Sequence, residues 1–188
     1  KSKQAVYLIP MPLFFIFALI ATSVFAQAPS RAEKRAAKVR EEYLKATEGI
    51  HVPTIRADSL KVHINDTDLV LVDVRQPNEQ MVSMLPHALT PYEFSQKFKS
   101  GFPKGKNVVA YCTIGHRSGL YAQQLEVRDI PVRNLEGGIL AWTHVSGILE
   151  RDSAGIKVPT KKVHVYADDM KNWIALDYEA VWPEQNNY

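Results

Sequence analysis

Residues 107–120 read NVVAYCTIGHRSGL, and this stretch decides the fold class. After Asn107 it begins with four apolar residues that do not alternate with polar ones. This pattern is typical of a strand that is covered on both faces of a sheet. A short loop follows, and residues 118–127 then have the composition of a helix. Cys112 falls where the strand becomes the loop, and ligands of α/β sheets bind at this end of the strands.

Beyond residue 50, the sequence alternates between strand and helix patterns. Apolar runs such as Leu69–Val72 lack polar alternation, as expected for buried parallel strands. This order predicts an α/β fold, with a doubly wound parallel sheet and flanking helices. We expect strands at 52–55, 69–72, 107–111 and 132–135, helices at 57–63, 92–99, 118–127 and 138–145, and a possible edge strand at 161–166.

The N-terminal segment has the features of a targeting signal. Lys1 and Lys3 provide a basic start, an apolar run extends from Leu13 to Ala21, and the small residue Ala26 follows. These features predict a secretory signal that is cleaved after Ala26. The alternative is a membrane anchor formed by residues 6–26. We therefore expect a protein that is exported, to the periplasm or another extracytoplasmic space, or anchored in the membrane.

The next segment, residues 27–50, is rich in strong helix formers. Its apolar stripe is mostly alanine, with Val39 and Tyr43 among the larger members. Because so little apolar area is available, we expect a solvated spacer helix that packs loosely on its domain. The alternative is a short partner-binding or coiled-coil seam.

Composition excludes several classes of function. Apolar residues make up 46% and charged residues 23%, which is typical of a folded globular domain, and the net charge of +3 is too small to predict nucleic-acid binding. The single cysteine cannot form an internal disulfide or a multi-thiolate zinc site, and no two of the six histidines have helical metal-ligand spacing. We predict no metal and no cofactor.

The loop after residue 111 is suited to stabilising an anion. A tight turn before a helix can direct backbone N–H groups at one point, where the helix N-terminus adds positive charge. This environment would favour the thiolate of Cys112 as a nucleophile, with Arg117 adding a cation, Gly115 permitting the turn and Ser118 capping the helix. The predicted site comprises catalytic Cys112 and the binding residues Thr113, Ile114, Gly115, His116, Arg117 and Ser118.

The motif Cys-x-x-x-x-Arg between strand and helix, here Cys112 to Arg117, resembles the active-site loop of rhodanese-like sulfurtransferases. Three further motifs occur in the order that this family shows. These motifs are Asp73-Val74-Arg75, Leu85-Pro86 followed by Ala88, and Leu135-Glu136-Gly137-Gly138 leading to Ala141-Trp142. Together with the cysteine loop, the resemblance covers residues 52–149.

The resemblance implies a sulfurtransferase that carries sulfane sulfur as a persulfide on Cys112. Its partners would be a small donor (thiosulfate, a persulfide or a polysulfide) and a thiol or cyanide-type acceptor. The related phosphatases have a loop one residue longer, so sulfur is favoured over phosphate. Asp73 and Arg75 would be structural, as a charge pair that braces the loops. Where relatives often have His and Gly, this chain has Met84 and His87, so donor and acceptor remain open.

Two alternatives to a sulfurtransferase are a non-catalytic binding or redox/sulfur-sensing module and a phosphatase. With the resemblance included, the predicted parts of the chain are a signal peptide or membrane anchor (1–26), a spacer helix (27–50), a rhodanese-like domain (51–150) and a C-terminal extension that packs on the domain (151–188).

Overall fold

The computed structural model describes residues 28–102 and 104–182. The predicted signal or anchor, residues 1–26, lies outside the described residues and stays a prediction. Within the described part, no helix has both the length and the hydropathy that crossing a bilayer would require.

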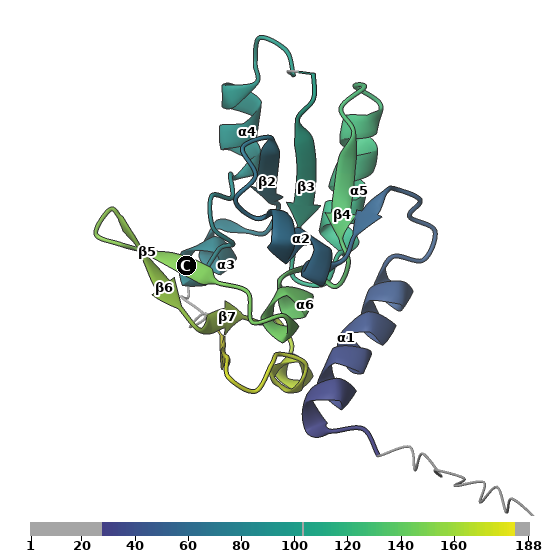
Figure 1. Cartoon of the computed structure of the whole chain (residues 1–188), viewed down its shortest axis with the longest axis vertical. Coiled ribbons are helices and arrows are strands. Elements are labelled where there is room, and N and C mark those ends of the chain that lie inside the picture. Colours follow the sequence, from purple (N-terminus) through teal and green to yellow (C-terminus); the bar gives the residue numbers. More distant parts are fainter. Residues whose placement is uncertain (1–27, 103, 183–188) are drawn as a thin grey trace, which may run out of the picture.

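A four-stranded parallel sheet forms the centre of the domain (Figure 1). Its strands are β1 (Thr54–Ile55), β2 (Leu69–Asp73), β3 (Asn107–Tyr111) and β4 (Val132–Leu135). Their order is β1-β4-β3-β2, so that β3, which leads to Cys112, has a neighbour on each side. Val109 of β3 lies opposite Leu71 of β2 and Arg133 of β4. The predicted parallel α/β sheet is therefore confirmed.

Helices cover both faces of this sheet. They are α1 (Arg31–Ala46), α2 (Ala57–His63), α3 (Pro77–Val82), α4 (Pro91–Lys97), α5 (His116–Glu126) and α6 (Gly138–His144). Strand residues such as Val72 and Val108 pack in one apolar cluster with α4 and α5. The residues between them, such as Leu71 and Val109, pack in a second cluster with α1, α2 and α6. Burial on both faces explains why the strands lack polar alternation.

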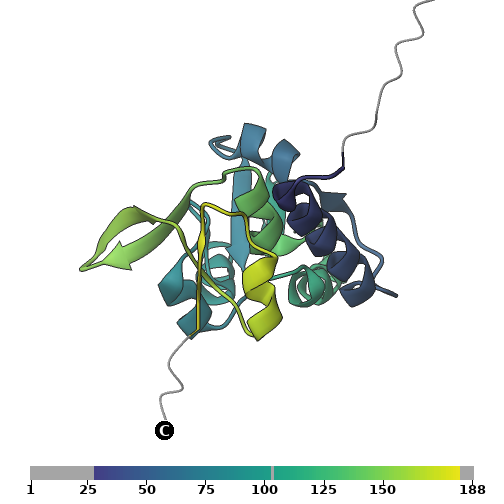
Figure 2. The same ribbon diagram turned by 90° about the horizontal axis from the view of Figure 1, so that it is seen from below.

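The helix α1 is part of the core, and the expectation of a loosely packed spacer is wrong. Val39 and Tyr43 are buried in the same cluster as Leu140 of α6. Figure 2 shows α1 lying against the body of the domain. The alanine-rich stripe hid this packing, because two large residues provide most of the buried contact.

The described part of the C-terminal extension packs on the domain. It contains the hairpin strands β5 (Leu149–Ser153) and β6 (Ile156–Thr160), then β7 (Lys162–His164), the 3-10 helix η1 (Asp168–Asn172) and β8 (Glu179–Val181). Ile174 and Tyr178 are buried in the main core cluster. The β5–β6 hairpin projects from the side of the domain (Figure 2).

The proposed edge strand at residues 161–166 does not join the main sheet. Instead, β7 pairs in parallel with β8 in a separate two-stranded sheet. At the outer edge of β2, Leu89 exchanges backbone hydrogen bonds with Leu71 and Asp73. These backbone groups are therefore already paired, and another strand could not pair with them.

Truncating Val39 to alanine should destabilise the domain by about 1–3 kcal/mol, because it removes buried methyl groups and leaves a cavity between α1 and α6. The measurement is urea unfolding followed by circular dichroism. Leu44→Ala, at an exposed position on the same helix, should cost less than about 0.5 kcal/mol. Equal effects of the two substitutions would mean that α1 does not contribute to the core.

Candidate active site

The loop that follows β3 curls around the sulfur of Cys112. The N–H of Gly115 donates a hydrogen bond to Sγ at 3.1 Å. Among the described hydrogen bonds, this is the one backbone amide that reaches the sulfur, where the sequence predicted several. Helix α5 begins at His116, with Gly115 as its N-cap at a φ of 116°. Ser118 therefore lies within the first turn of α5, and its predicted role as the cap is wrong.

Only glycine fits at position 115. Its positive φ is strained for any residue with a side chain. In addition, a Cβ atom there would lie 2.6 Å from the ring of Tyr43, which packs on the loop from α1. Helix α1 thus helps to hold the turn that places an amide on the sulfur.

Side chains from β4 and α5 fasten the same turn. Asn134 donates from Nδ2 to the carbonyl of Gly115 at 2.9 Å and accepts from Ser118 Oγ at 2.7 Å. Ser118 Oγ also lies 3.5 Å from the sulfur of Cys112. Because a hydroxyl has one proton, the shorter contact with Asn134 takes it. Ser118 is thus a support of the loop, and it does not line the cavity described below.

The N-terminus of α6 satisfies the loop carbonyls from the other side. The N–H of Ile139 donates to the carbonyl of Cys112 at 2.9 Å. Gly138 lies so close to the backbone of Cys112 and Thr113 that a Cβ atom would overlap both carbonyl oxygens. The predicted turn and helix start at residues 137–138 is therefore also a close packing contact with the site.

The cation of the loop is paired with a carboxylate that sequence reasoning missed. Arg117 donates to Glu79 through Nη1 (2.6 Å) and Nη2 (2.9 Å), and Nη2 also donates to Thr113 Oγ1 (3.0 Å). Burial by itself would raise the pKa of Glu79, but the hydrogen bonds from Arg117 and from the N–H of Gln76 outweigh it and lower the pKa to about 2. The bidentate hydrogen bonds of the guanidinium therefore go to Glu79, whereas the sequence predicted that they would go to the anion held by the loop.

Glu79 lies on α3, the helix that the sequence analysis did not predict. A signal for it exists, since Pro77 occupies the first turn and Glu79 the third helical position, where its carboxylate accepts from the N–H of Gln76. With only six residues, α3 is too short for its periodicity to be recognised.

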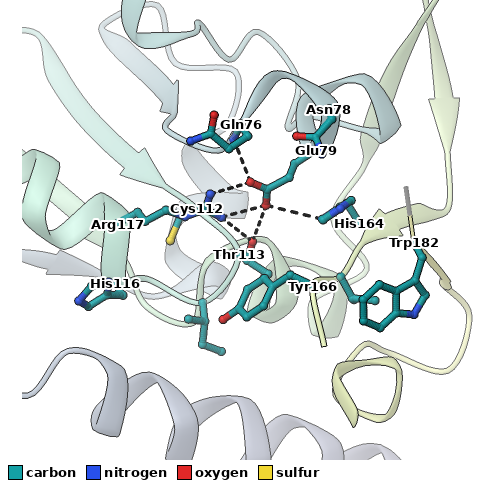
Figure 3. Close-up of a pocket in the computed structure, with 12 residues that line it drawn as sticks. Gln76, Asn78, Glu79, Cys112, Thr113, His116, Arg117, His164, Tyr166 and Trp182 are labelled. Atoms are coloured by element: carbon teal, nitrogen blue, oxygen red, sulfur yellow. Dashed lines mark hydrogen bonds and ion pairs between the residues drawn. The ribbon is translucent and has the colours of Figure 1, made fainter. Parts of the chain in front are cut away.

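Cys112 is one of the residues that line a cavity of about 570 Å³ (Figure 3). The residue itself is only 1% exposed, so the loop around it covers nearly all of its surface. Of the predicted binding residues, Thr113, Ile114, His116 and Arg117 line the cavity. His116 is exposed, as expected. The other lining residues are Gln76, Asn78 and Glu79 from α3 and its start, and His164, Val165, Tyr166 and Trp182 from the C-terminal extension.

His164 is a second residue that the sequence did not single out. It is 3% exposed, and its Nδ1 lies 3.6 Å from Glu79 Oε1. Neither ring nitrogen has a hydrogen-bond partner among the described residues. Burial lowers the pKa of His164, and the opposite effect of the Glu79 carboxylate is smaller, so the ring is neutral at neutral pH.

The Rhodanese-like domain profile matches residues 56–145 of the chain. A protein named sulfurtransferase from Allochromatium vinosum is 39% identical over 94 residues, which are 48% of this chain and 88% of that protein. The chain belongs to the rhodanese-like domain family. A putative sulfurtransferase, YtwF, from Bacillus subtilis is 30% identical over 96 residues, covering 50% of this chain and 92% of that protein.

A solved structure shows the same rhodanese-like fold. Thiosulfate sulfurtransferase from Pseudomonas aeruginosa superposes with a TM-score of 0.51 at 17% identity, over 73% of this chain and 26% of that one. The rhodanese-like profile ends at residue 145. His164, Tyr166 and Trp182 of the cavity therefore lie outside the region that defines the family.

The charge pair expected of this rhodanese-like domain is present at the end of β2. Arg75 donates to Asp73 from Nε (2.9 Å) and Nη2 (2.7 Å), and both side chains are fully buried. Tyr111, the residue before Cys112, donates its hydroxyl to Asp73 at 2.8 Å. Asp73 thus joins β2 to the start of the active-site loop.

Replacing Asp73 with alanine should destabilise the protein by about 3–5 kcal/mol, because it leaves the guanidinium of Arg75 buried without its partner. Chemical unfolding measures this loss. The exposed pair Arg56 and Asp58 has the same spacing in the chain, so Asp58→Ala is the matched control and should have a much smaller effect. Similar losses of unfolding free energy in both variants would show that burial does not determine how much the Asp73 pair stabilises the protein.

Glu79→Gln should remove part of the acid sensitivity of the protein. The folded-state pKa of Glu79, about 2, is below its ordinary value of 4.5, so the carboxylate stabilises the fold above that ordinary value. This contribution to the free energy of unfolding is on the order of 1–3 kcal/mol, because the Arg117 side chain is 34% exposed and solvent weakens the ion pair. It is lost as the pH falls toward about 2.

The measurement for Glu79 is the free energy of unfolding across this acid range. Glu93→Gln is the control, because Glu93 accepts from the N–H of Thr90 at the start of α4 as Glu79 does from Gln76, but it is exposed. The control should retain the wild-type slope. An unchanged slope in Glu79→Gln would contradict the lowered pKa.

Proposed function

We propose that this protein is a sulfurtransferase that carries sulfane sulfur as a persulfide on Cys112. The observation that supports this most strongly is the position of the sulfur. Cys112 lines a cavity at the carboxyl end of β3, its Sγ accepts from the N–H of Gly115 at 3.1 Å, and Arg117 lines the same cavity. Both groups stabilise negative charge on sulfur, which is the form that attacks a sulfane donor.

The first half-reaction transfers one sulfur atom to the protein. The Cys112 thiolate attacks the outer sulfur of a persulfide R–S–SH. A new sulfur–sulfur bond forms to Cys112, the sulfur–sulfur bond of the donor breaks, and the thiolate RS⁻ leaves with that electron pair. With thiosulfate as donor, sulfite leaves instead and the product is the Cys112 persulfide anion. In the second half-reaction, an acceptor thiolate attacks the outer sulfur of Cys112–S–SH and restores the Cys112 thiolate. Neither step requires an external oxidant or reductant.

The contacts of Arg117 suit it to this cycle. Hydrogen bonding to Glu79 is the main cause that raises the pKa of Arg117, and the attraction between the two charges adds to it. Glu79 balances the charge of the guanidinium and, with Thr113, holds it in one place beside the cavity, so it can donate a hydrogen bond to an anion there without reorganisation.

Incubation with thiosulfate, glutathione persulfide or polysulfide should add one sulfur atom to Cys112. Mass spectrometry of the intact protein detects this directly, because the chain has a single cysteine. Cys112→Ser should remain unmodified and should lose all transfer to an acceptor thiol, since hydroxyl oxygen forms no persulfide. If all three donors leave the wild-type protein unmodified, the proposal is wrong.

A non-catalytic binding or sensing module is the second candidate, and the pairing of Arg117 with Glu79 favours it, since the cation is engaged within the protein. Cys112→Ser distinguishes the two functions. A binding module would keep its ligand after this change, whereas a transferase would lose turnover.

A further inference from the structure

We propose that His164, Tyr166 and Trp182 of the C-terminal extension form a subsite that binds the organic part of a persulfide donor, a group that is aromatic or apolar and without net charge. This inference rests on the proposed sulfur transfer and adds the class of donor. The subsite lies in the same cavity as Cys112 but comes from residues that the rhodanese-like match, 56–145, does not include.

The size of the cavity exceeds what a small inorganic donor requires. Its volume of about 570 Å³ lies in the range of sites for organic ligands, about 300–1,000 Å³. Cys112 lines the cavity, and Val165, Tyr166 and Trp182 add apolar surface from the extension. Figure 3 shows Tyr166 and Trp182 on the side of the site formed by the extension. A donor whose outer sulfur reaches Cys112 would therefore place its organic group against these residues.

The charges along the cavity favour an uncharged group. Glu79 and Arg117 neutralise each other through two hydrogen bonds. His164, beyond Glu79 as seen from Arg117 in Figure 3, is buried and neutral, so it adds no cation to the outer part. Of the lining residues from the extension, His164, Val165, Tyr166 and Trp182, none carries a formal charge at neutral pH.

Two features of the subsite suit it to binding. Tyr166 and Trp182 line the cavity and are 52% and 47% exposed, so their rings are open to a molecule in it. Independently, both ring nitrogens of His164 are buried without a partner among the described residues. Such groups cost about 1–3 kcal/mol unless they are satisfied, so this part of the cavity is incomplete without water or a bound molecule.

The first test compares benzyl persulfide with thiosulfate as donors to Cys112. We expect the ratio of kcat/KM for benzyl persulfide to that for thiosulfate to fall about tenfold in the double variant Tyr166→Ala, Trp182→Ala, equivalent to about 1.4 kcal/mol of lost aromatic contact. Tyr166→Phe, which keeps the ring, should retain the wild-type ratio. Tyr92→Ala, at an exposed tyrosine of α4 outside the cavity, should also retain it.

The second test does not depend on turnover. Benzyl mercaptan, the thiol that benzyl persulfide would release, is titrated into Cys112→Ser protein by calorimetry, with and without the Tyr166→Ala and Trp182→Ala changes. The aromatic truncations should weaken binding about tenfold.

The outcomes separate this inference from the proposed function. Persulfide on Cys112 with an unchanged donor ratio in the double variant overturns the subsite and leaves sulfur transfer standing. If glutathione persulfide and polysulfide also fail together with these two donors in the wild type, sulfur transfer is overturned, and the titration then decides the subsite alone. No binding of benzyl mercaptan, or equal binding with and without the aromatic residues, overturns the subsite in either case.

Discussion

The buried carboxylate of Asp73 is the interaction on which the site depends. It accepts hydrogen bonds from the guanidinium of Arg75 and from the hydroxyl of Tyr111, and the same hydroxyl accepts from the N–H of Leu85. Arg75 in turn donates to the carbonyl of Ser83. A charge that is fully buried requires such partners, so β2, β3 and the segment after α3 can come together in only one arrangement. The active-site loop starts at the residue that follows Tyr111.

A second carboxylate, Glu79, organises the cavity in a similar way. It receives hydrogen bonds from Arg117 and Thr113 of the loop and from the N–H of Gln76, and it lies 3.6 Å from His164 of the extension. Three distant parts of the chain thus meet at one charged group. Because this group is mostly buried, moving any one of these parts would leave the charge less well satisfied.

The two carboxylates lie in different environments, one buried in the fold and one lining the cavity. Asp73 is sealed from solvent and its pair with Arg75 serves the fold. Glu79 borders the cavity, where it sets the position and the charge environment of Arg117. Among the described residues, the hydrogen-bonding contacts of the sulfur are few: the amide of Gly115, and the hydroxyl of Ser118 near the limit of hydrogen-bonding distance.

The sequence by itself determined the elements whose signals are local. The strands Asn107–Tyr111 and Val132–Leu135 and the helix Ala57–His63 were predicted with their observed bounds, because burial on two faces and helix composition are properties of neighbouring residues. The strand-to-loop position of Cys112 followed for the same reason. Only the tertiary structure decided that α1 packs in the core, that Arg117 faces Glu79 and that His164 reaches the cavity. These contacts join residues far apart in the chain. Which residues meet depends on how the helices and strands pack together, and local sequence patterns do not predict that packing.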